Sequence, residues 1–439
     1  MREAAEYLLK KLKEKGADDV VIRSVKSEGV NIKFANNKVV KNGLEMMHGI
    51  GVFFTKDKKI LATNFQDKDP KNLKKQIDNF VNSSMKFSSF LQPSKDYNGI
   101  ANGNFKYKDV LETYDKKVES IDEVDYVQKG INTANSEKTN GIFEKNIEEG
   151  VLLTSNNVDK DLKGTYLYFS IRAFNKDGSG HSNTCSRMLS KLEIEKSSEE
   201  AAKIAKLSIS PKEGDSGKYD IVFGTMPTIV FANQIAESCS PFSVEAGISF
   251  FADKINKKVT NIDFIDDGLK ENGYNSTPCD DEGVPTQRTS LIKDGILKTY
   301  LHNSSTAKKY NTNSTGNAGL VEPHASNLII EKGKCSEVND LIKEVKKGLY
   351  VTNIWYTRYQ NYLTGDFSTI PRDGCFVIKN GELKNSVKNI RISDNMLNIL
   401  SNIVAISKEK KQLKSWEAHD PGFVPEILVK NVNVSKAKI

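Results

Sequence analysis

Residues 278–319 read PCDDEGVPTQRTSLIKDGILKTYLHNSSTAKKYNTNSTGNAG, and this stretch decides the fold class of the chain. Two segments of alternating apolar and polar residues are joined here by Asp294-Gly295. An Asp-Gly pair between such segments predicts a β-hairpin, because both residues tolerate the positive φ of a tight turn. Asn380-Gly381 joins FVIK and ELKNSV in the same way. The C-terminal half is therefore predicted to be mainly antiparallel sheet.

The order of elements along the chain predicts an α+β fold. A helix, hairpins, a second helix, further hairpins and a mostly β region follow one another, without βαβ periodicity. We expect an N-terminal α/β sandwich-like domain with a mixed or antiparallel sheet, followed by a C-terminal domain that is mainly antiparallel β. The segment 210–217 is short, polar and contains Gly and Pro, which is typical of a linker. The expected domains are residues 1–210 and 217–439.

Local patterns place the individual elements. The first helix has apolar residues at helical spacing and is expected to end at Gly16. Turns are expected at Asn36-Asn37 and Asn42-Gly43, and a loop is expected at 177–180. Further helices are expected at Lys71–Met85, at Ile121–Ala134, from a cap at Ser197 to Leu207, and from about Pro227. Strands are expected at Val20–Val25, Val30–Phe34, Leu44–Phe54, Gly150–Thr154, Thr165–Phe174 and Tyr219–Phe223.

The composition is typical of a soluble globular protein. The net charge of +7 is dispersed, and the densest run, Lys408–Lys411, contains an acid, which argues against a specific nucleic-acid partner. No apolar run approaches the roughly 18 to 20 residues that a membrane span needs. The five cysteines form no CxxC pair, so neither a zinc ribbon nor a disulfide framework is indicated. Because the N-terminus predicts an amphipathic helix and not a signal peptide, we expect a cytoplasmic protein without a membrane partner.

Several common kinds of site are excluded by missing motifs. The chain has no GxxxxGK[ST], no GxGxxG after a strand and no GxSxG. A zinc-binding helix needs two histidines about one turn apart, but the closest pair here, His302 and His324, is 22 residues apart. Either of these histidines could act as a general base, or could be an ordinary surface or core residue. A metal site built from histidines distant in sequence stays open as an alternative.

The candidate site residues lie in three polar turns between strands. They are Asp280, Asp281 and Glu282; Thr315, Gly316 and Asn317; and Thr364, Gly365 and Asp366. The acidic turn could orient a basic group or hydrogen-bond a peptide backbone, or it could be a solvated turn shaped by Gly and Pro. The other two turns could present backbone amides to a ligand, or they could be no more than tight turns.

Taken together, these segments resemble the TldD/PmbA family, also called modulators of DNA gyrase and classed among metallopeptidases. The resemblance covers nearly the whole chain and rests most on DDEGVPTQRTSLIKDGILKTYL (280–301), STGNAG (314–319), LTGDFS (363–368) and GCFVIKNGEL (374–383). It implies that the three polar turns line a substrate cleft.

The resemblance also implies one of two branches. The TldD branch holds a zinc ion with an HExxxH helix and a distant cysteine, whereas the PmbA (TldE) branch lacks them. Here the corresponding helix, PTIVFANQIAESCS (227–240), contains no histidine. The segment that would supply the cysteine, 415–428, has His419 but no cysteine. The sequence is therefore similar to the PmbA branch, which implies no metal ligand and no catalytic residue in this chain.

What the resemblance implies is a subunit of a metalloprotease that acts on unfolded or modified peptides. Such a subunit would pair with a zinc-bearing TldD-type chain, and the zinc would belong to that partner. One alternative is a peptidase active alone as a homodimer, with a different metal set or none. Another is a non-enzymatic binding protein that modulates DNA gyrase.

Overall fold

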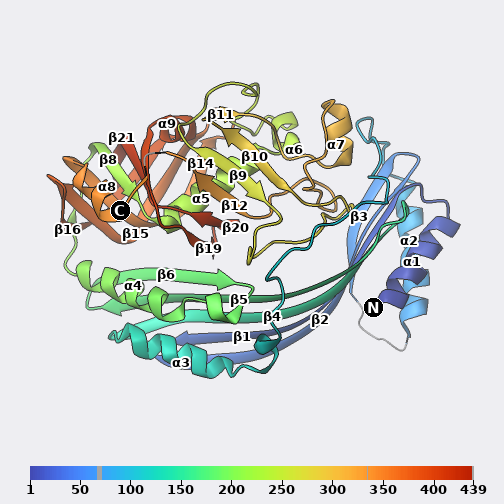
Figure 1. Ribbon diagram of the computed structural model, residues 1–439, viewed down its shortest axis with the longest axis horizontal. Coiled ribbons are helices and arrows are strands. Elements are labelled where there is room, and N and C mark those ends of the chain that lie inside the picture. Colours follow the sequence, from blue (N-terminus) through green and yellow to red (C-terminus); the bar gives the residue numbers. More distant parts are fainter. Residues whose placement is uncertain (67–71, 334, 438–439) are drawn as a thin grey trace.

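The computed structural model describes residues 1–66, 72–333 and 335–437. A long curved sheet with its helices forms the lower part of the molecule in Figure 1, and a β-rich part lies above it. The predicted α+β class is confirmed, with both antiparallel and mixed sheets. Within the described ranges, no helix is long and apolar enough to cross a membrane.

The N-terminal sheet is antiparallel throughout, in the order β3-β2-β1-β4-β5-β6. Its strands are β1 (Val20–Ala35), β2 (Lys38–Lys56), β3 (Lys59–Gln66), β4 (Lys138–Thr154), β5 (Asp159–Asn175) and β6 (Gly178–Ser186). Asn36 and Asn37 form the β1–β2 turn with φ of 51° and 63°, as predicted. The second predicted turn is wrong: Asn42 and Gly43 lie inside β2, paired with Ile32 and Asn31 of β1.

Helices cover the N-terminal sheet in two groups. The helices α1 (Arg2–Glu14) and α2 (Leu73–Ser88) pack on one end, and α3 (Glu123–Ala134) and α4 (Ile194–Leu207) pack on the other (Figure 1). The helices predicted near Gly16, at 71–85 and at 121–134 are confirmed, although Lys71 lies outside the described residues.

Two boundaries in this part differ from the expected ones. The helix α4 begins three residues before the predicted cap: Ser197 lies inside it, buried, and donates from its backbone to Glu193. Apolar Ile194 starts the helix instead, because its side chain belongs to the buried cluster beneath α3 and α4. The predicted loop at 177–180 is shorter than expected, since Gly178 already pairs with Asn175 as part of β6.

The C-terminal part contains two further sheets. One has the order β11-β10-β9-β12-β20-β19, and the other has the order β13-β18-β21-β8-β14-β15-β16-β7, with β17 pairing β15 and β21. Their strands are β7 (Lys212–Glu213), β8 (Gly217–Phe223), β9 (Asp263–Asp267), β10 (Arg288–Lys293), β11 (Ile296–Leu297), β12 (Leu328–Glu331), β13 (Cys335–Ser336), β14 (Lys347–Asn361), β15 (Asp366–Lys379), β16 (Glu382–Lys388), β17 (Ile390–Asn395), β18 (Ile403–Ser407), β19 (Lys411–Ser415), β20 (Ala418–Val424) and β21 (Ile427–Lys436).

Most strand pairs in these two sheets are antiparallel, as predicted. The predicted hairpin turns at Asp294-Gly295 and Asn380-Gly381 join β10 to β11 and β15 to β16. Four pairs are parallel: β12–β20, β13–β18, β8–β14 and β7–β16. Parallel pairs need long connections between their strands, which the hairpin pattern could not reveal.

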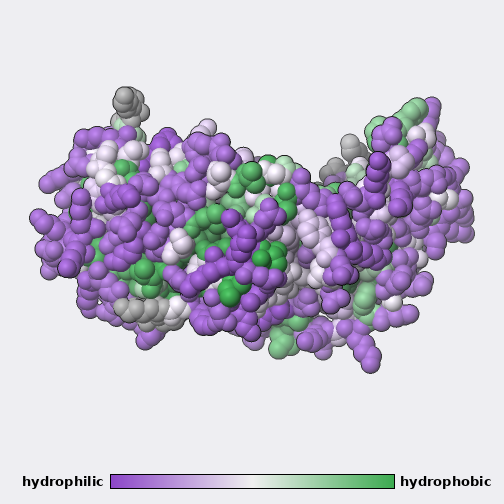
Figure 2. Space-filling view, turned by 90° about the horizontal axis from the view of Figure 1, so that it is seen from above, coloured by the Kyte–Doolittle hydropathy of each residue, from purple (hydrophilic) through white to green (hydrophobic). Residues whose placement is uncertain are grey.

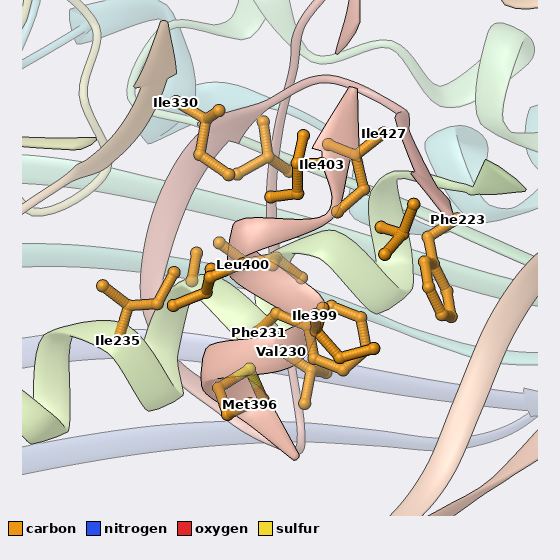
Figure 3. Packing of buried hydrophobic residues seen from close by; sticks show 14 of the residues in the cluster. Phe223, Val230, Phe231, Ile235, Ile330, Met396, Ile399, Leu400, Ile403 and Ile427 are labelled. Atoms are coloured by element: carbon orange, nitrogen blue, oxygen red, sulfur yellow. The ribbon is translucent and has the colours of Figure 1, made fainter. Parts of the chain in front are cut away.

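The helix α5 (Thr225–Ser238) is the centre of the C-terminal core. It starts two residues before the predicted Pro227, and nearly all its side chains are buried. Figure 3 shows Val230 and Phe231 of α5 beside Met396 and Ile399 of α9 (Met396–Ser401). A helix that is apolar on all sides has to be enclosed by other elements. The remaining helices are α6 (Pro241–Glu245), α7 (Ser304–Lys309) and α8 (Val338–Lys343).

A buried polar cluster joins the two parts of the molecule. Arg172 of β5 forms an ion pair with Asp373 of β15, with Nε and Oδ1 3.1 Å apart. Asp373 also accepts hydrogen bonds from Ser179 at 2.9 Å and from Asn353 at 2.9 Å. The upper face, in Figure 2, is mostly hydrophilic with apolar residues gathered near its middle.

Candidate substrate groove

A groove with a volume of about 410 Å³ lies where the N-terminal sheet meets loops of the C-terminal part. The sheet contributes Arg23 of β1, Glu148 of β4 and Tyr166 of β5. The opposite wall comes from two loops, 275–281 and 316–318. The second loop and residues 278–281 of the first belong to the stretch that the sequence singled out.

Asp280 holds these two loops together. Its Oδ1 accepts hydrogen bonds from the backbone N–H groups of Glu282 at 3.0 Å and Val284 at 2.9 Å. Its Oδ2 accepts from the N–H of Ala318 at 2.9 Å. Burial and the neighbouring Glu282 raise the pKa of Asp280 well above its usual value. The alternative of a solvated acidic turn is wrong for Asp280 and Glu282, since both are buried.

The other two acidic residues differ in position, since Asp281 lines both the groove and a second cavity, whereas Glu282 lines only the second cavity. Asp281 lines the groove, and its Oδ1 lies 3.4 Å from Nη1 of Arg23. Glu282 instead accepts a hydrogen bond from the N–H of Ser304 at 3.2 Å. It lines a second cavity of about 270 Å³ beside the groove. Burial raises the pKa of Glu282.

Two residues of the second motif, Gly316 and Asn317, line the groove, whereas Thr315 lies behind them. Gly316 has φ +68°, and a Cβ there would lie 2.5 Å from the carbonyl oxygen of Pro285, so only glycine fits. Asn317 lines the groove while its Nδ2 donates to Asp266 at 2.6 Å and to the carbonyl oxygen of His324 at 3.0 Å. Thr315 is buried, and its Oγ1 accepts from the N–H of His302 at 2.7 Å.

The third motif lies elsewhere in the molecule. Thr364, Gly365 and Asp366 form the turn between β14 and β15, and none of them lines the groove. Asp366 is exposed, and hydrogen bonds from Asn395 and Thr364 lower its pKa. The structure therefore brings the first two motifs together but not the third.

The two histidines that flank the second motif differ in their environments. His302 is buried, its Nδ1 lies 3.2 Å from Oγ1 of Thr306, and burial lowers its pKa to about 4. His324 is exposed at the groove and donates from Nδ1 to the carbonyl oxygen of Ala325 at 3.0 Å. Of the two, only His324 can meet a bound molecule.

Arg187 is a groove residue that the sequence gave no reason to select. It is fully buried, and its guanidinium lies 4.0 Å from the ring centroid of Tyr166. It donates to the carbonyl oxygens of Thr113 at 2.7 Å, Tyr274 at 3.2 Å and Ser276 at 3.1 Å. Arg187 thus fixes the first groove loop on the sheet, through contacts 74 to 89 residues apart along the chain.

Comparison with known proteins identifies the chain. Residues 216–436 match the PmbA/TldA metallopeptidase C-terminal domain, which is half of the chain. The chain belongs to the PmbA/TldD family. Its groove loops 275–281 and 316–318 and its helix α5 all lie within the matched region.

Two curated relatives of the PmbA/TldD family and one solved structure illustrate the similarity. The metalloprotease TldD homolog of Buchnera aphidicola is 31% identical over 229 residues, covering 50% of this chain and 47% of that protein. The metalloprotease PmbA homolog of Haemophilus influenzae is 27% identical over 216 residues, covering 48% and 46%. The chain thus spans about half the length of these curated relatives. TldE from Thermococcus kodakarensis shares the fold, with a TM-score of 0.85, 21% identity and coverage of 98% and 100%.

Metalloprotease relatives imply zinc in the PmbA/TldD family, but the side chains in the described part of this chain form no group that fits a zinc ion. The helix α5 carries no histidine, and its polar Asn233 is bound to the backbone of Asp420, accepting from N–H and donating to C=O at 2.9 Å each. Nowhere in the described residues do three His, Cys, Asp or Glu side chains gather as a metal site. At the groove, Asp280 accepts from backbone N–H groups, Asp281 pairs with Arg23, and His324 donates to the carbonyl oxygen of Ala325.

Proposed function

We propose that this chain is a cleft-forming subunit of a PmbA/TldD-type metalloprotease that acts on unfolded or modified peptides. In this proposal a zinc-bearing TldD-type chain pairs with it and breaks the peptide bond. The observation that carries the proposal is the groove, since its walls come from both parts of the molecule and follow the family's sequence motifs.

The groove suits an extended peptide. Its walls carry both signs of charge, since Arg23 and Lys160 line it together with Glu148 and Asp281, so neither a strongly acidic nor a strongly basic ligand is favoured. The strands β1, β4 and β5 are paired on both sides. Recognition of a peptide backbone in the groove therefore falls to the loops 275–279 and 316–318.

The side chains that could bind a metal ion support a role in which this chain does not cleave the peptide bond itself. A metalloprotease polarises water and the scissile carbonyl with its metal ion. The residues of α5 offer no histidine for that ion, and His302 is buried and neutral. In this proposal, the chain still binds the peptide and aligns it, so that the scissile bond lies at the partner's metal ion.

The test is reconstitution with a TldD-type chain that carries HExxxH. We expect the two chains to co-purify, zinc to be found in the pair but not in this chain alone, and an unfolded peptide to be cleaved only by the pair.

The substitution Arg23→Ala should raise the KM of the pair for the peptide by about tenfold, with little change in kcat. The reason is that the peptide loses a hydrogen bond from the charged Arg23 guanidinium. Arg358→Ala, at an exposed arginine outside the groove, is the matched control.

Two results would decide against the proposal. Bound zinc together with robust cleavage by the lone chain would show a self-sufficient peptidase instead. Unchanged kinetics of the pair with Arg23→Ala would show that the peptide does not use this groove.

A further inference from the structure

The first half of β2 forms an open edge of the N-terminal sheet. β3 pairs with Gly49–Lys56 of β2, and the preceding residues of β2 pair with β1 on their other side. Over residues 40–46, no second neighbouring strand is found in the described part of the chain. In Figure 1 β2 lies along the lower margin of the sheet, away from the C-terminal part.

Exposed apolar side chains concentrate on this edge. Val40, Leu44 and Met46 are 62%, 72% and 66% exposed. Of the 21 large hydrophobic residues that are exposed within the described ranges, five lie between Val39 and Met47. Proteins normally protect an edge of this kind, because its unpaired backbone groups and apolar side chains attract another strand.

The two charged residues within 40–46 are of opposite sign. Lys41 and Glu45 are both exposed, and neither forms an ion pair with any residue that the structure describes. Lys41 also lies directly opposite Lys33 of β1. Like charges in this position destabilise a strand pair, so an acidic neighbour on the open side of Lys41 would be stabilising.

The edge is complementary to itself. If two copies of this strand pair antiparallel about Gly43, Lys41 of each copy lies opposite Glu45 of the other, and Val40 lies opposite Met46. Gly43 then lies on the two-fold axis. A shift of the axis by one residue, to Asn42 or Leu44, removes both opposite-charge pairs. Charge and apolar patterns therefore favour one register.

We propose that residues 40–46 of β2 pair with the same residues of a second copy of this chain, in a two-fold symmetric dimer with one continuous sheet. The pairing is isologous, so each favourable contact occurs twice. An extended peptide could also add to an open edge, but it would have no need for the reciprocal Lys41 and Glu45. The inference does not depend on the proposed function.

Charge substitutions test the dimer. The full-length chain should sediment as a dimer, and Lys41→Glu or Glu45→Lys alone should weaken dimerisation by at least about tenfold, because each places two like-charged pairs in the interface. An equimolar mixture of the two variants should form a heterodimer, since both contacts are then between opposite charges. The double variant K41E/E45K should dimerise like the wild type.

Two controls show that the substitutions act on the dimer contact and not on folding or on surface charge in general. Both positions are exposed, so the free energy of unfolding measured at a concentration where each variant is monomeric should stay within about 0.5 kcal/mol between variants. Lys218→Glu, at an exposed strand lysine in β8, should leave the dimer intact. A monomeric wild type, or a dimer indifferent to both single substitutions, would overturn the proposal. If the single substitutions leave the dimer unchanged but abolish peptide binding, the edge binds a peptide and not a second copy of the chain.

Discussion

Buried carboxylates organise the loops that form the groove. Asp280 accepts hydrogen bonds from three backbone amides, and Asp266 accepts from the side chain of Asn317 and from the N–H of Ser326 at 2.6 Å. Each carboxylate replaces the water that these donors would otherwise bind. Their role is therefore to hold Asn317 and the backbone around Ala318 in place for a ligand.

Because Asp266 is buried, we expect the free energy of unfolding to depend on pH. Burial raises its pKa to about 7, above the value of about 4 in an unfolded chain. Because the native state binds this proton more tightly, the contribution of Asp266 to stability is fully present below about pH 4 and is lost as the pH rises to about 7. The free energy of unfolding of the wild type, relative to Asp266→Asn, should therefore fall over this range and be level above it. Denaturant unfolding at a series of pH values measures this, and a constant difference would contradict it.

The helix α5 shows how one element organises the C-terminal core. It packs against α9, β14 and β20, and its Asn233 fixes the backbone of Asp420 in β20. Phe231 is 2% exposed and meets Phe223 and Phe367 edge-on, with ring centroids 5.0 Å and 5.9 Å away. The helix α5 is therefore a structural support of the C-terminal core.

Truncating the centre of α5 should be strongly destabilising. Phe231→Ala removes buried aromatic contacts and leaves a cavity, which costs about 3 to 5 kcal/mol of unfolding free energy. Phe90→Ala is the matched control, because Phe90 is 72% exposed. Urea unfolding followed by circular dichroism measures both variants. Equal losses for the two would mean that α5 is not packed as described.

The whole molecule depends on the junction between its two parts. The ion pair of Arg172 and Asp373 links β5 to β15, while Arg187 links the sheet to the first groove loop. The side chain of Asp373 is 1% exposed. The groove lies between the sheet and the C-terminal loops, so its shape depends on this junction.

Breaking the ion pair tests this dependence. Asp373→Ala leaves Arg172 without its partner and should lower the free energy of unfolding by about 3 to 5 kcal/mol. Asp215→Ala removes a carboxylate that is 82% exposed and should change it by less than about 0.5 kcal/mol. Chemical denaturation monitored by tryptophan fluorescence compares the two. A small effect of Asp373→Ala would show that other contacts hold the junction.

The sequence by itself determined the features that depend on neighbouring residues. The turns at Asn36-Asn37, Asp294-Gly295 and Asn380-Gly381 all have positive φ, because tolerance of that conformation is a property of the residue itself. The same preference failed at Asn42-Gly43, since pairing along the whole of β1 outweighs two turn-forming residues. The α+β class was predictable for the same local reasons, whereas the choice of the first two motifs as cleft residues rested on the family resemblance.

Only the tertiary structure decided which residues meet. Arg23 of β1 and Arg187, directly after β6, reach the groove from positions far along the chain from its loops, and the polar turn at 364–366 lies outside it. Whether Asp280 is solvated or buried also depends on Ala318, 38 residues away. Burial and hydrogen bonding are set by partners distant in sequence, so local patterns could propose these residues but could not place them.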